Sequence, residues 1–127
     1  MVSGPVTDPG RLASLAARAA SSKQGEAIVV LDVRDLITIT DYFVIVSGAS
    51  DRQVKTIADE VVKSLKEQGT RPVRQEGEPA AGWVLLDFVD FVVHVFGEEQ
   101  RDYYRLDNLW ADAPVIDWEE KAEAASR

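Results

Sequence analysis

Apolar residues recur at helical spacing in two segments of the chain. In residues 51–68 they form one stripe, which predicts a helix packed on a core: Val54, Ile57, Ala58, Val61, Val62 and Leu65. Ser50 and Gln53 have the spacing of a capping box at the start of this helix, and Gly69 marks its end. A second stripe predicts a helix over residues 9–22 that begins after Asp8.

Other short segments have the patterns of β-strands. Residues 27–31 are a continuous apolar run, typical of a strand buried on both faces, and residues 42–46 are rich in β-branched and aromatic residues. Residues 71–76 are polar and include a proline, so a strand there would lie at the edge of a sheet. Residues 83–96 have the length of a hairpin, and residues 98–110 predict a final helix with acidic residues in its first turn.

The predicted order of elements is therefore α-β-β-α-β-β-β-α. Short connections between consecutive strands favour antiparallel pairing, so we expect an α/β fold of the α+β type: one domain with a mixed, mostly antiparallel sheet of about five strands packed with helices. We expect a flexible N-terminus over residues 1–8, the domain over residues 9–113 and a peripheral tail over residues 114–127.

The predicted hairpin has two unlike faces. With a two-residue turn at Phe88-Val89, Asp87 would pair with Asp90 and Trp83 with His94, and side chains would alternate across the sheet. One face would be wholly apolar and belong to the core: Val84, Leu86, Phe91, Val93 and Val95. The other would mix large apolar groups with carboxylates and an imidazole: Trp83, Leu85, Asp87, Asp90, Val92, His94 and Phe96.

The mixed face has two interpretations. An aromatic anchor with apolar neighbours and a charged rim is typical of a protein-binding surface. Alternatively, the C-terminal tail or the last helix covers this face, because buried unpaired charge is costly and an uncovered apolar face is adhesive.

The charge of the chain is strongly uneven. The 127 residues include 14 Lys and Arg and 22 Asp and Glu, which gives a net charge of −8. Residues 82–120 hold the whole excess, with Arg101 and Arg105 as their bases and these acids: Asp87, Asp90, Glu98, Glu99, Asp102, Asp107, Asp112, Asp117, Glu119 and Glu120. Such a surface disfavours direct binding to nucleic acid and favours a basic protein partner. The alternative interpretation is that the acidic surface only keeps the protein soluble.

Composition excludes several classes of site. The chain has no cysteine, so disulfides, thiolate metal sites and a cysteine nucleophile are excluded, and His94 is its one histidine. The apolar runs are far shorter than the roughly 20 residues of a membrane-spanning helix, so we expect no membrane partner.

The sequence gives little support for any of its candidate catalytic groups. Asp32 with Asp35, and Asp87 with Asp90, are three residues apart, so along a continuous strand the members of each pair would face opposite ways. Across a tight turn Asp87 and Asp90 would face the same way, but they lack further ligands in sequence, and turn formation is the favoured role of both pairs. Residues 47–50 precede a helix as phosphate loops do, but they lack the Gly-Lys-Ser/Thr signature, which favours capping by Ser50. We therefore expect no catalytic, metal or cofactor site.

Several blocks of sequence closely resemble the ribosomal silencing factor family, also called RsfS or Iojap. They are LDVRDL (31–36), TDYFVIVSGASDRQV (40–54), WVLLDFVDFVVHVF (83–96) and RDYYRLDNLW (101–110), and the resemblance covers about residues 10–113. It implies a nucleotidyltransferase-like fold that is not known for that chemistry. It further implies binding to the large ribosomal subunit through a basic ribosomal protein of the uL-fourteen type, which blocks joining of the small subunit when nutrients are short.

Combined with the mixed face, this resemblance predicts a set of partner-binding residues: Trp83, Leu85, Asp87, Asp90, Val92, His94, Glu98, Glu99 and Arg101. No organellar leader is evident, so we expect a cytoplasmic bacterial member of the family. Whether the free protein forms a homodimer is left open by the sequence. The alternative function is a nucleotidyltransferase-like enzyme that uses Ser50 near phosphate and aspartates on Mg²⁺. One departure concerns Val89, where the family pattern has glycine: valine disfavours positive φ, so either the turn type or the hairpin register differs.

Overall fold

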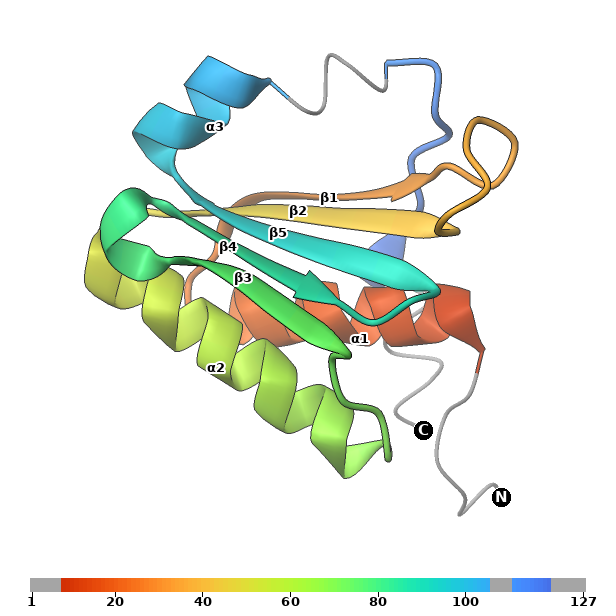
Figure 1. Ribbon diagram of the computed structural model, residues 1–127, viewed down its shortest axis with the longest axis horizontal. Coiled ribbons are helices and arrows are strands. Elements are labelled where there is room, and N and C mark those ends of the chain that lie inside the picture. Colours follow the sequence, from red (N-terminus) through yellow and green to blue (C-terminus); the bar gives the residue numbers. More distant parts are fainter. Residues whose placement is uncertain (1–7, 106–110, 120–127) are drawn as a thin grey trace.

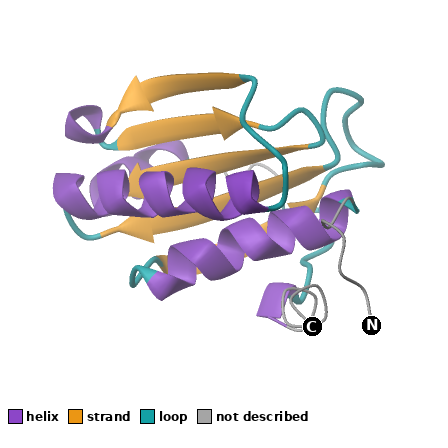
Figure 2. Ribbon diagram, turned by 90° about the horizontal axis from the view of Figure 1, so that it is seen from below, coloured by secondary structure: helices purple, strands orange, loops and turns teal. Residues whose placement is uncertain are grey.

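Two long helices pack side by side against one face of a five-stranded sheet in the computed structural model, which describes residues 8–105 and 111–119 (Figures 1 and 2). The elements follow in this order: α1 (Pro9–Ser22), β1 (Glu26–Asp32), β2 (Tyr42–Gly48), α2 (Asp51–Glu67), β3 (Arg74–Glu78), a 3-10 turn (Pro79–Ala81), β4 (Trp83–Asp87), β5 (Phe91–Gly97) and α3 (Glu98–Tyr104). The predicted order and the α+β class are confirmed.

The predicted helix caps are present. Asp8 accepts a hydrogen bond from the Arg11 N–H at 3.0 Å at the start of α1. The Ser50 hydroxyl accepts from the Gln53 N–H at the start of α2, and the Gln53 side chain accepts from the Ala49 N–H, so the capping box closes one residue earlier than its usual form. After α2, Gly69 has φ +80°, and the Thr70 N–H donates to the Leu65 carbonyl, which is the closure of a Schellman motif.

The last helix is shorter than predicted. α3 ends at Tyr104 because Arg105 takes a left-handed conformation with φ +51°, which breaks the helical path. The prediction of one continuous helix over residues 98–110 was therefore wrong at Arg105. Residues 106–110 lie outside the described part of the chain.

The strands lie in the order β1-β2-β5-β4-β3. The central pair, β2 and β5, is parallel, and the other three pairs are antiparallel, so the sheet is mixed and mostly antiparallel as predicted. β3 lies at the edge, as predicted for a strand over residues 71–76, but it begins two residues after Pro72 and runs from Arg74 to Glu78. Parallel pairing of β2 with β5 requires a crossover, which α2 and the β3–β4 hairpin provide.

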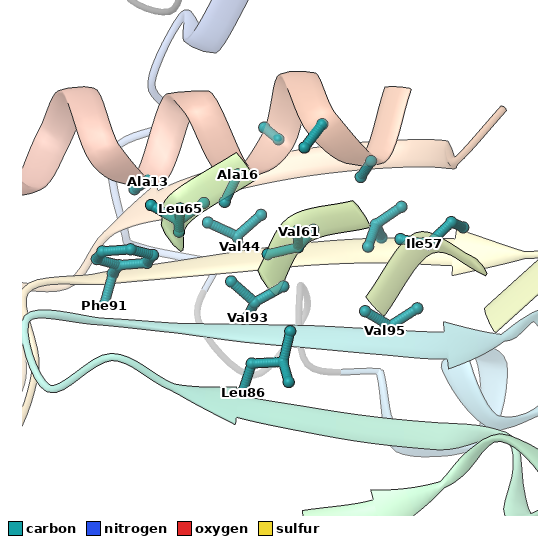
Figure 3. Close-up of a cluster of buried hydrophobic side chains, with 14 of the residues drawn as sticks. Ala13, Ala16, Val44, Ile57, Val61, Leu65, Leu86, Phe91, Val93 and Val95 are labelled. Atoms are coloured by element: carbon teal, nitrogen blue, oxygen red, sulfur yellow. The ribbon is translucent and has the colours of Figure 1, made fainter. Parts of the chain in front are cut away.

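The main core lies between the sheet and the helix pair (Figure 3). Its sheet side includes all five residues of the predicted apolar face of the hairpin: Val84, Leu86, Phe91, Val93 and Val95. Its helix side includes Ile57, Val61 and Leu65 of α2 and the small residues Ala13 and Ala16 of α1. Alanines at this interface let the helix backbone approach the sheet closely.

The hairpin register differs from the predicted one. Leu85 pairs with His94 and Trp83 with Phe96. Each β4 residue therefore pairs with a β5 residue two positions later in the sequence than predicted. The turn accordingly lies at Val89-Asp90, where the Phe88 N–H donates to the Phe91 carbonyl at 2.9 Å. A shift of two residues preserves the alternation of side chains, so the assignment of the two faces is unaffected.

Val89 occupies the strained position of this turn. It has φ +74°, and the Asp90 N–H donates to the Phe88 carbonyl across it at 3.0 Å. Positive φ is unfavourable for a β-branched residue, so the conflict expected at Val89 is real. The Asp87 carboxylate accepts from the Val89 N–H at 2.8 Å and helps to hold the turn.

We expect Val89→Gly to raise the free energy of unfolding by about 1 kcal/mol. Relief of the positive-φ strain, roughly 1–3 kcal/mol, exceeds the cost of glycine in the unfolded state, roughly 0.5–1 kcal/mol. Denaturant unfolding of both proteins measures the difference. Val73→Gly is the control, because Val73 is also exposed but has no positive φ, and it should lower stability. Equal destabilisation by both changes would contradict the assignment of strain to Val89.

The first part of the segment predicted to be a peripheral tail runs along the outer edge of β1. The Asp32 N–H donates to the Pro114 carbonyl at 2.9 Å, and the Ile116 N–H donates to the Val30 carbonyl at 2.8 Å. Ile116 and Trp118 also pack against the main core. In the described residues, no helix combines the length and hydropathy needed to cross a membrane.

Candidate functional site

The candidate site lies on the sheet face opposite α1 and α2, which we call the open face. Each strand alternates its side chains, so the register lays out rows of neighbours across this face. One row runs Val29, Ile45, His94, Leu85 and Glu76 from β1 to β3. The polarity therefore rises across the sheet, from aliphatic side chains on β1 and β2 to carboxylates on the edge strand.

The β1 side of the open face is covered. A second apolar cluster there buries Leu31, Val33, Ile45, Phe96 and Ala113. Ile37, from the loop between β1 and β2, packs on it as a partly buried side chain. Ala113 thus covers part of this face, although the interpretation that the face is covered had assigned this role to the last helix or to the tail over residues 114–127.

The β4 side of the open face is only partly exposed. Trp83, Leu85, Val92 and Phe43 are half-buried there, and Trp83 and Phe43 also pack against the second apolar cluster. Two edge-strand carboxylates follow on the same face, because Glu76 pairs with Leu85 and Glu78 with Trp83. The binding-patch interpretation therefore fits this half of the face. Phe43 was not among the predicted site residues, although its alternation with buried neighbours in β2 places it on this side.

His94 lies beneath this surface. Its ring makes an edge contact with Phe43 at 5.5 Å and a stacked contact with Phe96 at 5.9 Å between centroids. The Trp83 indole N–H points at its Nδ1 atom at 3.4 Å. Burial lowers the pKa of His94 to about 4, so the imidazole is neutral at pH 7. His94 therefore lies buried beside Trp83 on this face, and its predicted contact with a partner stays a prediction.

The remaining predicted site residues lie at two ends of the sheet. Asp87 and Asp90 flank the β4–β5 turn, where Asp87 also contacts Arg74 at 3.4 Å. Glu98 and Glu99 are exposed on α3 at the opposite end. Arg101, on the same helix, donates to the Ser47 hydroxyl at 3.0 Å. The nine residues consequently form two groups: the hairpin residues on the open face and its turn, and the α3 residues after the end of β5.

An open hollow of about 600 Å³ lies beside α3. Charged side chains of both signs line it, together with Ser47 and Ala27: Glu26, Glu98, Arg101, Asp102 and Arg105. Large apolar side chains, which line most small-ligand pockets, are absent from these described lining residues.

Three of the groups considered for an enzymatic role, Ser50, Asp32 and Asp87, have structural partners. The Ser50 hydroxyl caps α2, and the Asp87 carboxylate holds the hairpin turn. Asp32 forms a two-bonded ion pair with the Arg34 guanidinium at 2.6 and 2.9 Å, which holds the pKa of Asp32 below its usual range. Across residues 8–105 and 111–119, no group of three or more histidine and carboxylate side chains is placed to hold a metal ion.

Comparison with known proteins supplies the family. Residues 6–127 match the family model described as "Ribosomal silencing factor during starvation". A ribosomal silencing factor of Halalkalibacterium halodurans is 44% identical over 108 residues, 85% of this chain and 92% of the relative. A crystal structure of a Chromobacterium violaceum protein superposes with a TM-score of 0.79 at 36% identity, covering 83% of this chain and 88% of that one. A Mus musculus relative named "Mitochondrial assembly of ribosomal large subunit protein 1" is 37% identical over 86 residues, 65% of this chain and 38% of the relative.

Proposed function

Because this chain belongs to the ribosomal silencing factor family, a family of translation regulators, we propose that it binds the large ribosomal subunit and thereby blocks joining of the small subunit. The name of the mouse relative, which refers to assembly of the large subunit, supports the choice of subunit. This activity requires occlusion of a surface and no chemical step. Binding to bacterial ribosomes would place the protein in the cytoplasm.

The observation that carries the proposal is the partly exposed half of the open face. Trp83, Leu85 and Val92 offer apolar contact area there, and Trp83 has the size and rigidity of a binding anchor. Carboxylates lie beside them on the edge strand and at the hairpin turn, with Arg74 paired to two of them: Glu76, Glu78, Asp87 and Asp90. This arrangement complements a basic protein surface with an apolar centre, such as a ribosomal protein of the uL-fourteen type.

A nucleotidyltransferase-like enzyme was the alternative function. It would need free carboxylates to bind Mg²⁺ and a free Ser50 hydroxyl beside a phosphate. Asp32, Asp87 and Ser50 are instead engaged in an ion pair, a turn and a helix cap. These contacts support a binding protein over a catalyst, and we propose no cofactor.

We expect the purified protein to co-sediment with large subunits and not with small subunits. Sucrose-gradient sedimentation of the protein with each isolated subunit measures this directly. Added small subunits should then form fewer complete ribosomes when the factor is present. Equal binding to both subunits, or unimpaired subunit joining, would contradict the proposal.

We also expect salt to weaken this binding without abolishing it. Charges at the rim are screened over about 8 Å at physiological ionic strength and about 3 Å at 1 M salt, while apolar contacts persist. Titrations from low to high potassium chloride should therefore show a falling affinity that reaches a plateau. Affinity that is independent of salt would remove the acidic rim from the interface.

A further inference from the structure

Exposed large apolar side chains gather at one end of the sheet. The described residues include five: Leu36, Ile39, Val73, Val89 and Val115. Leu36, Ile39 and Val89 lie in the β1–β2 loop and the β4–β5 turn, which are joined at this end of the sheet, whereas Val73 precedes the edge strand β3 and Val115 pairs with β1 at the opposite edge. Single exposed apolar residues are ordinary on a soluble protein, whereas the grouping of Leu36, Ile39 and Val89 indicates an interaction surface.

The loop between β1 and β2 is built to present two of these side chains. The Val33 N–H donates to the Asp41 carbonyl at 2.9 Å and closes the base of the loop. The Leu36 and Ile37 N–H groups both donate to the Val33 carbonyl at 3.0 Å, and Ile37 packs inward on the open-face cluster. Ile39 is nevertheless 83% exposed. A loop anchored in this way holds its outward side chains in place before any partner arrives.

This loop is joined to the hairpin turn beside it. The Asp41 N–H donates to the Asp90 carbonyl at 3.0 Å, which brings Val89 next to the loop. Phe43 and Val92 are half-buried on the open face. They pair with each other in β2 and β5, one residue after these strands begin, and so lie close to the loop and the turn. Leu36, Ile39 and Val89, which we call the loop patch, therefore continue the apolar surface of the open face.

The charges around the loop patch are acidic. Asp35, Asp41 and Asp90 form no ion pair with any residue in the described ranges. The nearby Arg34 is held by Asp32 at 2.6 Å and lies over the Tyr42 ring, so its charge is already engaged. Apolar side chains ringed by free carboxylates match a basic protein surface and oppose a phosphate backbone.

We propose that the loop patch is a second contact for the basic ribosomal protein that occupies the open face, with Ile39 as its anchor. This inference rests on the proposed function, because it assigns further residues to the same partner. The partner would then contact both the sheet surface around Trp83 and the β1–β2 loop. The two contacts together fix its orientation, which a single flat patch cannot do.

The test compares Ile39→Ser with Val73→Ser in large-subunit binding. Val73 is 68% exposed at the edge-strand margin, so the two variants lose a similar exposed apolar side chain. We expect Ile39→Ser to weaken binding by about tenfold or more, as the loss of a buried isoleucine contact implies. Val73→Ser should bind as the unaltered protein does, and both variants should melt normally.

The unaltered protein separates the two claims. If it fails to bind large subunits, the proposed function fails and the inference fails with it. If it binds and Ile39→Ser binds equally well, or both serine variants are weakened alike, the inference alone is overturned.

Photo-crosslinking identifies the class of partner. A benzophenone amino acid placed at position 39, and in a separate protein at position 85 on the open face, should form adducts with the same ribosomal protein. An adduct to ribosomal RNA, to a second copy of this chain, or to a different protein at each position would overturn the inference.

Discussion

Trp83→Ala is expected to weaken large-subunit binding about thirtyfold while the domain stays folded. Trp83 is half-buried on the open face at the first position of β4, with its indole N–H directed at His94. Truncation of a central aromatic anchor costs roughly 2 kcal/mol or more of binding free energy, and roughly 1.4 kcal/mol corresponds to a factor of ten. Quantitative sedimentation or fluorescence titration against large subunits measures the affinity.

Leu86→Ala is the matched control, because Leu86 is in the same strand and points to the opposite face. It is 1% exposed and packs in the main core, so its truncation should lower the free energy of unfolding by roughly 2–5 kcal/mol. Whatever Leu86→Ala protein remains folded should bind subunits normally. If instead Trp83→Ala melts early and Leu86→Ala loses only binding, the binding surface must be moved to the helix side of the sheet.

The stability of the protein should fall as the pH is lowered from 6.5 to about 4 because of His94. In the unfolded chain the imidazole takes up a proton near pH 6.5, but in the folded protein burial lowers its pKa to about 4. Within this window the unfolded state binds more protons, so lowering the pH favours unfolding. The full contribution, about 3 kcal/mol, is present above pH 6.5 and is lost as the pH passes below 4.

His94→Gln separates this effect from that of the many carboxylates. Carboxylates titrate in both proteins, so the difference between their unfolding free energies, measured by urea denaturation at each pH, isolates the imidazole. The free energy of unfolding of the unaltered protein, relative to that of the variant, should decrease as the pH falls, even if the variant is less stable at pH 7. If this difference stays constant from pH 7 to pH 4.5, His94 titrates normally in the folded protein.

The hairpin shows how far a pattern of residues predicts a fold. Alternation assigned the core face correctly, because the side-chain period of a strand is independent of the pairing partner. The register was wrong by two residues, because it depends on the turn. Valine at position 89 does not itself indicate the positive φ that it adopts, since glycine or asparagine is the usual residue there, and only the glycine of the family pattern pointed to this position.

The candidate site was predicted in part for a similar reason. The mixed face of the hairpin was visible because its residues are contiguous in sequence. Phe43 and the β1–β2 loop join the same surface only through the parallel pairing of β2 with β5 and the Asp41–Asp90 hydrogen bond. His94 was grouped with surface residues because strand alternation gives the side of the sheet on which a residue lies but not what covers it.

By itself, the sequence determined the positions and types of nearly all the elements, the core stripe of α2 and the uneven distribution of charge. Each of these depends on residues a few positions apart, through the helical period of 3.6, the strand period of 2 and the capping groups. Only the tertiary structure decided the strand order, the covering of β1 by residues 114–116 and the burial of His94. Those features arise from contacts between distant segments, where many pairings satisfy the same local pattern and the packing of the whole domain selects one.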